Sequence, residues 1–317
     1  MSRKIFWLVI KGTISLTAIL FILSRINLGE FAKVFFSASP PLFLLAFLFA
    51  VFVWVLNTRK WQLLLLTLGV KYNFNKLLKL NFVALYYSLF LPGQVSGEVV
   101  KGLKLIRSNK EDAHNILTSI IMDRITGLFA LVLIALLGLV VVSSPGVNHR
   151  LILLAVIVLF GLTIFFFLIL NNRIAVLLKR LSLPVFMAAN LRRHLYLTWE
   201  TFRSYKKDLS SLGKVFGYSL LFQLLATVIN YLVCLSLEVA IPFLALLWIV
   251  ATVSLLQMLP ISISGIGVRE GSFVFLLGQY GVGAPEALAV SIMIFAIQIL
   301  QGLIGGVVEL TEGVTER

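Results

Sequence analysis

The sequence predicts an all-α, polytopic integral membrane protein with about six full spans and two broken or re-entrant helical elements that form an inverted repeat. Composition is the first reason: 60% of the 317 residues are hydrophobic, 13% are charged, and the mean hydropathy is +1.04. A soluble domain could not bury that much apolar surface in one core. The second reason is a segment that occurs twice, and the third is an uneven distribution of basic residues between the loops.

The repeated segment reads Leu-Pro-x-x-x-Ser-Gly-x-x-Val-[Lys/Arg] and occupies residues 91–101 and 259–269. Proline removes a backbone donor and clashes with the preceding turn, so an apolar helix that reaches it must kink or end. The serine then offers a cap to a new helix, and the glycine beside it allows another backbone to come close. Each copy therefore predicts a broken helix, with breaks at Pro92, Gly93 and Pro260. The alternative is a chance match between two ordinary kinked helices.

Apolar runs predict the full spans, because a helix needs about 20 residues to cross the hydrocarbon core. Residues 25–39 have the pattern of a short amphipathic helix, and residues 61–79 are typical of a segment in the membrane interface. The broken elements follow at residues 81–101 and 242–280, and the apolar part of the first is too short to span. The full spans are expected at residues 5–24, 40–60, 111–143, 150–170, 215–237 and 285–308 of one transmembrane domain, 1–317.

Basic residues set the predicted orientation through the positive-inside rule. If the N-terminus is cytoplasmic, most loop lysines and arginines, Lys60 among them, lie inside. Outside lie only Arg25, Lys33 and Arg150. Both termini are then cytoplasmic, and the broken elements enter from opposite sides because three full spans separate them.

A basic stretch, residues 171–214, carries nine lysines and arginines. This pattern is typical of cytoplasmic helices that lie on an anionic membrane surface. The net charge of +14 therefore indicates contact with lipid and not with nucleic acid.

No cofactor or metal is expected. The single cysteine, Cys234, and the three scattered histidines form no set of ligands with metal-site spacing. The sequence also lacks the Gly-x-x-x-x-Gly-Lys-[Ser/Thr] loop that would bind ATP. An enzyme is not expected, because the carboxylates at membrane depth adjoin basic residues and no nucleophile–base pair is recognisable.

Six ionisable residues of the predicted membrane segments are candidates for function, because each charge there costs about 2.5 to 3.5 kcal/mol. They are expected to neutralise one another when the site is empty and to exchange partners when an anionic headgroup binds. The alternative is an ion-pair cluster that only fixes packing. The expected partners are Arg269 or Lys101 for Asp123, and Glu270 or Glu98 for Arg124.

Uncharged polar residues and glycines within the spans are assigned to helix packing. Interhelical hydrogen bonds are expected from Gln223, Asn230, Gln257, Gln298 and Gln301. Close helix contact is expected at Gly302, Gly305 and Gly306.

The segments 91–101, 119–128 and 265–270 resemble the lysylphosphatidylglycerol synthase transmembrane (flippase-like) family, and the likeness extends over nearly the whole chain. That family is similar to the part of bacterial aminoacyl-phosphatidylglycerol synthases that moves the modified lipid to the outer leaflet. Stand-alone members are linked to the handling of lipids or polyprenyl-linked glycans. The resemblance implies a prokaryotic cytoplasmic membrane. It also implies that this chain, without the synthase domain, does not aminoacylate lipids.

The repeat and the resemblance together suggest the residues of a substrate site, with the phosphate near the two serines and the cations that end each repeat. The usual Gly-Gly-Asp-x-x-Arg of the family is replaced here by the six residues 96–101, which end in lysine. Lysine cannot bind a phosphate in the bidentate manner of arginine, so the departure bears on substrate identity. The candidates are Ser96, Gly97, Glu98, Lys101, Asp123, Arg124, Ser264, Gly265, Gly267, Arg269 and Glu270.

The expected function is a flippase or transporter for a phospholipid or a polyprenyl-phosphate-linked lipid, with the phosphate held between two half-helix N-termini. Membrane lipids are the expected partners, and a homodimer or a partner from lipid biosynthesis stays open. Two other functions also stay open. One is a secondary transporter of a small anion, and the other is a non-catalytic membrane subunit that assists lipid or glycolipid synthesis.

Overall fold

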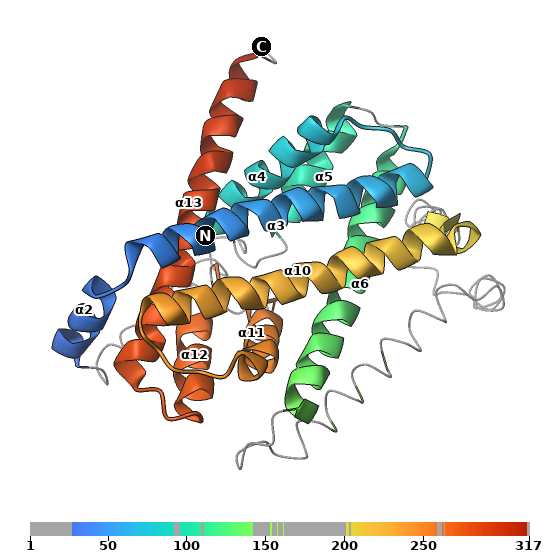
Figure 1. Cartoon of the computed structure of the whole chain (residues 1–317). Coiled ribbons are helices and arrows are strands. Elements are labelled where there is room, and N and C mark those ends of the chain that lie inside the picture. The colour runs from blue at the N-terminus through green and yellow to red at the C-terminus, as the bar shows by residue number, and fades with distance from the viewer. Residues whose placement is uncertain are drawn as a thin grey trace, which may run out of the picture.

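The computed structural model describes residues 27–91, 96–108, 111–141, 153, 157, 161, 201–202, 204–258, 262 and 264–315. Every regular element in these ranges is a helix (Figure 1). Four are long and apolar enough to cross a membrane: Pro40–Thr67, Ala113–Val141, Leu209–Ser236 and Ala284–Thr311. This confirms the predicted class of all-α polytopic membrane protein. The predicted span 5–24, most of the predicted span 150–170, most of the basic stretch 171–214, and the breaks at Pro92, Gly93 and Pro260 lie outside the described residues.

Two series of four helices with the same order of lengths make up most of the described chain. The first comprises α3 (Pro40–Thr67), α4 (Phe74–Phe90), α5 (Ser96–Ser108) and α6 (Ala113–Val141). The second comprises α10 (Leu209–Ser236), α11 (Phe243–Met258), α12 (Val268–Gly278) and α13 (Ala284–Thr315). Their lengths are 28, 17, 13 and 29 residues in the first series and 28, 16, 11 and 32 in the second. The short α2 (Leu28–Phe36) precedes the first series, and the single turn η1 (Tyr205–Lys207) precedes the second.

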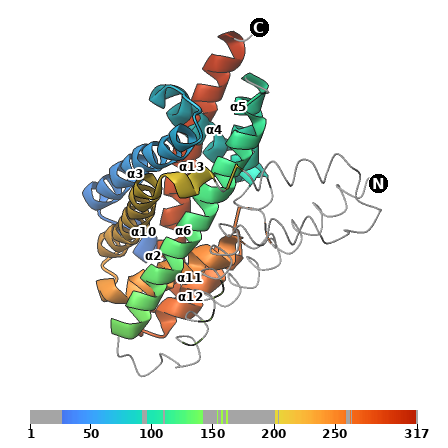
Figure 2. The same ribbon diagram turned by 90° about the vertical axis from the view of Figure 1, so that its right-hand side faces the viewer.

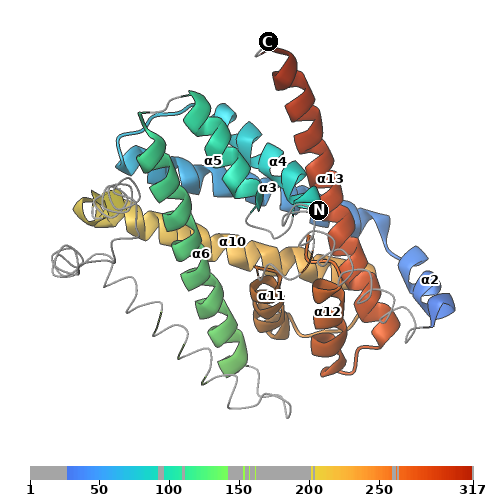
Figure 3. The ribbon, with the colours of Figure 1, turned by 180° about the vertical axis from the view of Figure 1, so that it is seen from behind.

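Corresponding helices of the two series run in opposite directions. In Figure 1, α3 and α10 lie side by side and antiparallel. Along the chain, α6 runs downward in this view and α13 runs upward. Seen from behind in Figure 3, α4 with α5 and α11 with α12 fill opposite ends of the space between α6 and α13.

Each series packs its first short helix against the last long helix of the other. α4 lies against α13, and α11 lies against α6, where Figure 2 shows them adjacent. Glycines permit both approaches, because a Cβ on Gly305 would collide with the Phe82 carbonyl and one on Gly138 would lie 2.8 Å from the Trp248 nitrogen. The predicted role of Gly302, Gly305 and Gly306 in close helix packing is therefore confirmed.

Helix α3 is longer than the predicted span, which was expected to end near Lys60. Nothing between Asn57 and Thr67 breaks a helix, and the first breaker is Gly69, whose φ of 81° closes the helix end. The hydrogen bond from the Val70 nitrogen to the Leu65 carbonyl, at 3.0 Å, completes that cap. The prediction of one interfacial segment over 61–79 is wrong, because residues up to Thr67 continue α3 and α4 begins at Phe74.

The two copies of the repeated segment each lie between two short helices, but their local structures differ. In the first copy α5 begins at Ser96 itself. In the second copy the matching Ser264 lies in a turn with φ 52°, Gly265 and Gly267 have φ of 76° and 86°, and α12 begins only at Val268. The second helix of the pair thus starts later in the repeat. Gly97 and Gly265 are aligned, so the difference in sequence is Gly267, which stands where the first copy has Val99 and allows the left-handed backbone before α12.

Candidate functional site

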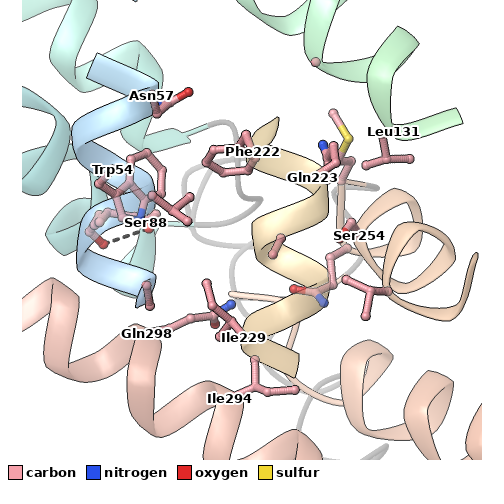
Figure 4. A pocket seen from close by; sticks show the side chains of 18 of the residues that line it. Trp54, Asn57, Ser88, Leu131, Phe222, Gln223, Ile229, Ser254, Ile294 and Gln298 are labelled. Atoms are coloured by element: carbon pink, nitrogen blue, oxygen red, sulfur yellow. Dashed lines mark hydrogen bonds between the residues drawn. The ribbon is translucent and has the colours of Figure 1, made fainter. Parts of the chain in front are cut away.

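A cavity of about 340 Å³ lies where the two series meet (Figure 4). Its walls come from α3, α4, α5 and α6 of the first series and from all four helices of the second. The volume is near the lower end of about 300 to 1,000 Å³ for small-molecule pockets, which suits a headgroup better than a whole lipid.

One wall of the cavity carries charged side chains from α3, α5 and α6. Lys60 Nζ lies 2.9 Å from Asp123 Oδ1, and the two side chains are only 6% and 5% exposed. Arg124 Nε donates to Glu98 Oε2 at 2.5 Å, and these side chains are 29% and 13% exposed. Arg124 is therefore the charged group of this wall that a ligand reaches most easily.

Lys101 lies behind this wall in a packed polar network. Its Nζ donates to Asn81 Oδ1 at 3.1 Å, lies 3.9 Å from Glu98 Oε1, and sits 4.3 Å from the centre of the Trp61 ring. Asn81 in turn donates to Thr58 Oγ1 at 2.8 Å. Lys101 is only 1% exposed, so it positions Glu98 and does not line the cavity.

A second buried ion pair joins Arg269 and Glu270 at the start of α12. Arg269 is 0% exposed and donates to Glu270, to Ser291 Oγ at 3.1 Å and to Gln298 Oε1 at 3.1 Å. Glu270 accepts a 2.6 Å hydrogen bond from the Gly267 nitrogen and so caps its own helix. This cluster also lies off the cavity, which it reaches only through Gln298.

The predicted pairing is right in one case. Arg124 pairs with Glu98 as expected. Asp123 pairs with Lys60 at 2.9 Å, although the basic residues predict a cytoplasmic loop at Lys60. The pairing of Arg269 with Asp123 is wrong, since the guanidinium is occupied by Glu270, its neighbour in sequence.

Lys60 was missed because the predicted span ended at that residue. Asn57 and Lys60 are three residues apart and both line the cavity, so they share a face of the helix. A single polar face that continues past Asn57 was the signal in the sequence that α3 does not stop there.

The predicted site residues divide into those that line the cavity and those that lie off its wall. Glu98, Asp123, Arg124 and Ser264 line the cavity. The glycines serve packing, since a Cβ on Gly97 would collide with the Ala84 carbonyl and one on Gly265 would lie 3.0 Å from Gln257 Oε1. Off the cavity wall lie Ser96, Gly97, Lys101, Gly265, Gly267, Arg269 and Glu270.

The opposite wall of the cavity is polar but uncharged. Of the amides assigned to interhelical hydrogen bonds, Gln298 on α13 does accept one from Arg269 on α12. Asn230 instead donates to the Ala226 carbonyl of its own helix at 2.8 Å. Figure 4 shows Gln223 and Ser254 on one side, Trp54 and Asn57 across from them, and Gln298 reaching in from α13 below.

Metal ligation has no support in the described part of the chain. No three His, Cys, Asp or Glu side chains gather there as a set that could hold an ion, and Cys234 is buried.

Long apolar helices around a charge-lined internal cavity define a multi-pass membrane protein with a polar site between its helices. The profile of the family described as "Lysylphosphatidylglycerol synthase TM region" matches residues 8–306. The chain belongs to this family, as its motifs indicated, and hence to membrane proteins of lipid-related function. In a comparison with individual curated proteins, none matches the chain.

Proposed function

We propose that this protein moves a phospholipid or a polyprenyl-phosphate-linked lipid between the two leaflets of a membrane. The observation that carries the proposal is the cavity with two ion pairs, Lys60–Asp123 and Glu98–Arg124, among helices long enough to span. Ionisable groups at membrane depth are expensive and most often mark a substrate path.

The two antiparallel helix series are, in this proposal, an inverted repeat. Corresponding helices begin 169 to 172 residues apart, and each series packs its first short helix on the last helix of the other. Inverted repeats with interrupted helices at their junction allow a transporter to rock around a central site. The cavity lies at such a junction, so the same headgroup site can be offered to either leaflet in turn.

Glu98 provides a way to exchange partners when a phosphate enters. Its carboxylate lies 2.5 Å from Arg124 Nε and 3.9 Å from Lys101 Nζ. A phosphate that binds Arg124 displaces Glu98, which keeps a cation nearby in Lys101. Arginine suits this step because its planar guanidinium binds phosphate through two parallel hydrogen bonds.

The remaining parts of the proposal come from the sequence: the orientation from its basic loops, the prokaryotic membrane from the family resemblance, and the absence of catalysis from the lack of a recognisable nucleophile–base pair. The protein acts without a catalytic step, in the cytoplasmic membrane of a prokaryote, with both termini inside. Its partners are membrane lipids, and a homodimer or a lipid-biosynthesis enzyme is a further candidate.

Lipid translocation in proteoliposomes that contain only this protein tests the proposal. Wild type is expected to move one class of phosphate-bearing lipid, measured with headgroup-resolved probes. Arg124→Gln is expected to slow transport by about tenfold or more, because a charge-assisted hydrogen bond to the phosphate is lost. Arg107→Gln is the control, since it removes the same charge from an exposed position on α5.

Two rival functions give different results in the same vesicles. A carrier for a small soluble anion would release entrapped phosphate or carboxylate and leave every lipid probe in its leaflet. A non-catalytic subunit would move nothing alone and would co-purify with an enzyme. Equal rates for Arg124→Gln and Arg107→Gln would contradict the assignment of Arg124.

A further inference from the structure

The uncharged wall of the cavity carries a chemistry that phosphate binding does not use. Among the described residues, α10, α11 and α13 give the cavity amide and hydroxyl groups and no charged side chain. Such groups donate and accept hydrogen bonds without neutralising a charge. They are Ser219, Gln223, Asn230, Ser254, Gln257, Gln298 and Gln301.

Asn230 presents a hydrogen-bond acceptor with no donor. The residue is 8% exposed and lines the cavity. Its Nδ2 donates to the Ala226 carbonyl at 2.8 Å, which fixes the amide orientation, because a flipped amide would set two oxygens against each other. Within the described ranges no group donates to Asn230 Oδ1. A buried acceptor without a donor is costly, so this oxygen is suited to a donor that a ligand brings.

Gln298 offers the complementary donor from α13. Its Oε1 accepts a 3.1 Å hydrogen bond from Arg269 Nη1, and arginine can only donate. The amide oxygen of Gln298 is therefore turned to Arg269. The amide nitrogen, Nε2, points the other way and is the donor that this bond does not use. Figure 4 shows the side chain extending from α13 toward α10.

We propose that this wall is a subsite for hydroxyl groups of the lipid headgroup, with Asn230 as acceptor and Gln298 as donor. The ligand class is a headgroup that bears a polyol or a sugar beside its phosphate. A hydroxyl both donates and accepts, so it satisfies both amides without adding charge. An alkyl group would leave the two amides without partners, and an ammonium group could not accept from Gln298. This inference rests on the proposed function, because it assigns the rest of the same headgroup site.

A matched pair of soluble lipids tests the subsite. Dihexanoyl phosphatidylglycerol and dihexanoyl phosphatidylpropanol have the same charge and nearly the same size, and they differ by two hydroxyls. Binding to the full chain in detergent is followed by tryptophan fluorescence, since Trp54 lines the cavity. Wild type is expected to bind the glycerol lipid about tenfold or more tightly, because a site built for hydroxyls rejects the analogue that lacks them.

Asn230→Leu is expected to lower the ratio of the two dissociation constants several-fold, while the Gln298 donor remains, and to leave the phosphatidylpropanol constant unchanged. Thr227→Val is the control, because Thr227 lies on the same helix, is buried, and bonds only its own backbone at 3.1 Å. Equal binding of both lipids by wild type, or equal weakening of both by Asn230→Leu, overturns the subsite. If wild type prefers the glycerol lipid and Asn230→Leu reduces that preference, but no lipid is moved in proteoliposomes, the subsite stands and the proposed transport fails.

Discussion

The pair formed by Lys60 and Asp123 shows that a buried charged side chain at membrane depth needs a partner of opposite charge. Both side chains are almost completely buried, and 2.9 Å separates their charged atoms. Burying each charge alone would cost several kcal/mol, and the partner is the nearest opposite charge that offsets this cost. The pair is therefore a condition for closing α3 onto α6, whatever the ligand does.

Lys60→Met is expected to destabilise the protein by about 3 kcal/mol or more, because it leaves Asp123 as an unpaired buried charge. Adding Asp123→Leu to that variant should restore most of the lost stability. Equilibrium unfolding in mixed micelles measures both. The comparison is Lys104→Met, which breaks a 2.6 Å pair with Glu309 whose side chains are 33% and 23% exposed. That change should cost less than about 1 kcal/mol. Equal losses of stability for Lys60→Met and Lys104→Met would contradict a greater contribution of the buried pair.

The contact between α4 and α5 depends on the absence of a side chain. Gly97 lies in the first turn of α5 and is pressed against the Ala84 carbonyl of α4. The same short helix carries Glu98 to the cavity, so the spacing of these two helices sets the position of the carboxylate that pairs with Arg124.

Gly97→Ala is expected to cost at least about 2 kcal/mol, because the new methyl group collides with backbone that cannot move aside locally. Transport should fall as well, since Glu98 moves with α5. Gly217→Ala on α10 is the matched change, because nothing lies within 4 Å of the added carbon there. It should be neutral or slightly stabilising, as alanine favours helices. Thermal unfolding and proteoliposome transport measure the two effects, and a Gly97→Ala protein of wild-type stability would contradict the close approach.

Much of the helix order was predictable from the sequence, because long apolar runs and the twin Pro…Ser-Gly segments are local signals. The residues of the site and their partners were harder to predict. The pairing of Arg124 with Glu98 could be anticipated from charge alone, whereas that of Asp123 with Lys60 depends on how far α3 continues and how it meets α6. Likewise, Arg269 was expected on the cavity, but α13 supplies Ser291 and Gln298 to hold it away. Such contacts between distant segments are set by packing, which no single segment encodes.

At the scale of the whole molecule, the two series border the cavity with helices in the same order of lengths. The contact of α4 with α13 corresponds to the contact of α11 with α6. In the proposed rocking motion, one contact would change as the cavity opens to one leaflet, and the other as it opens to the opposite leaflet. The charges, however, are not shared equally. Those that line the cavity within the described residues come from α3, α5 and α6, so the two series resemble each other in helix order and not in the charges they give the cavity.

The inverted relation predicts that matching helix ends face opposite sides of the membrane. Arg107 lies at the end of α5 and Gln279 directly follows α12, and both are exposed. In a Cys234→Ala background, Arg107→Cys is expected to react with an impermeant maleimide only from the cytoplasmic side, where the basic loops lie. Gln279→Cys should react only from the other side. Labelling is compared in right-side-out and inside-out vesicles. Reaction of both cysteines from one side would rule out the inverted repeat and the rocking model with it. An exchange of the two sides would keep the repeat and reverse the orientation.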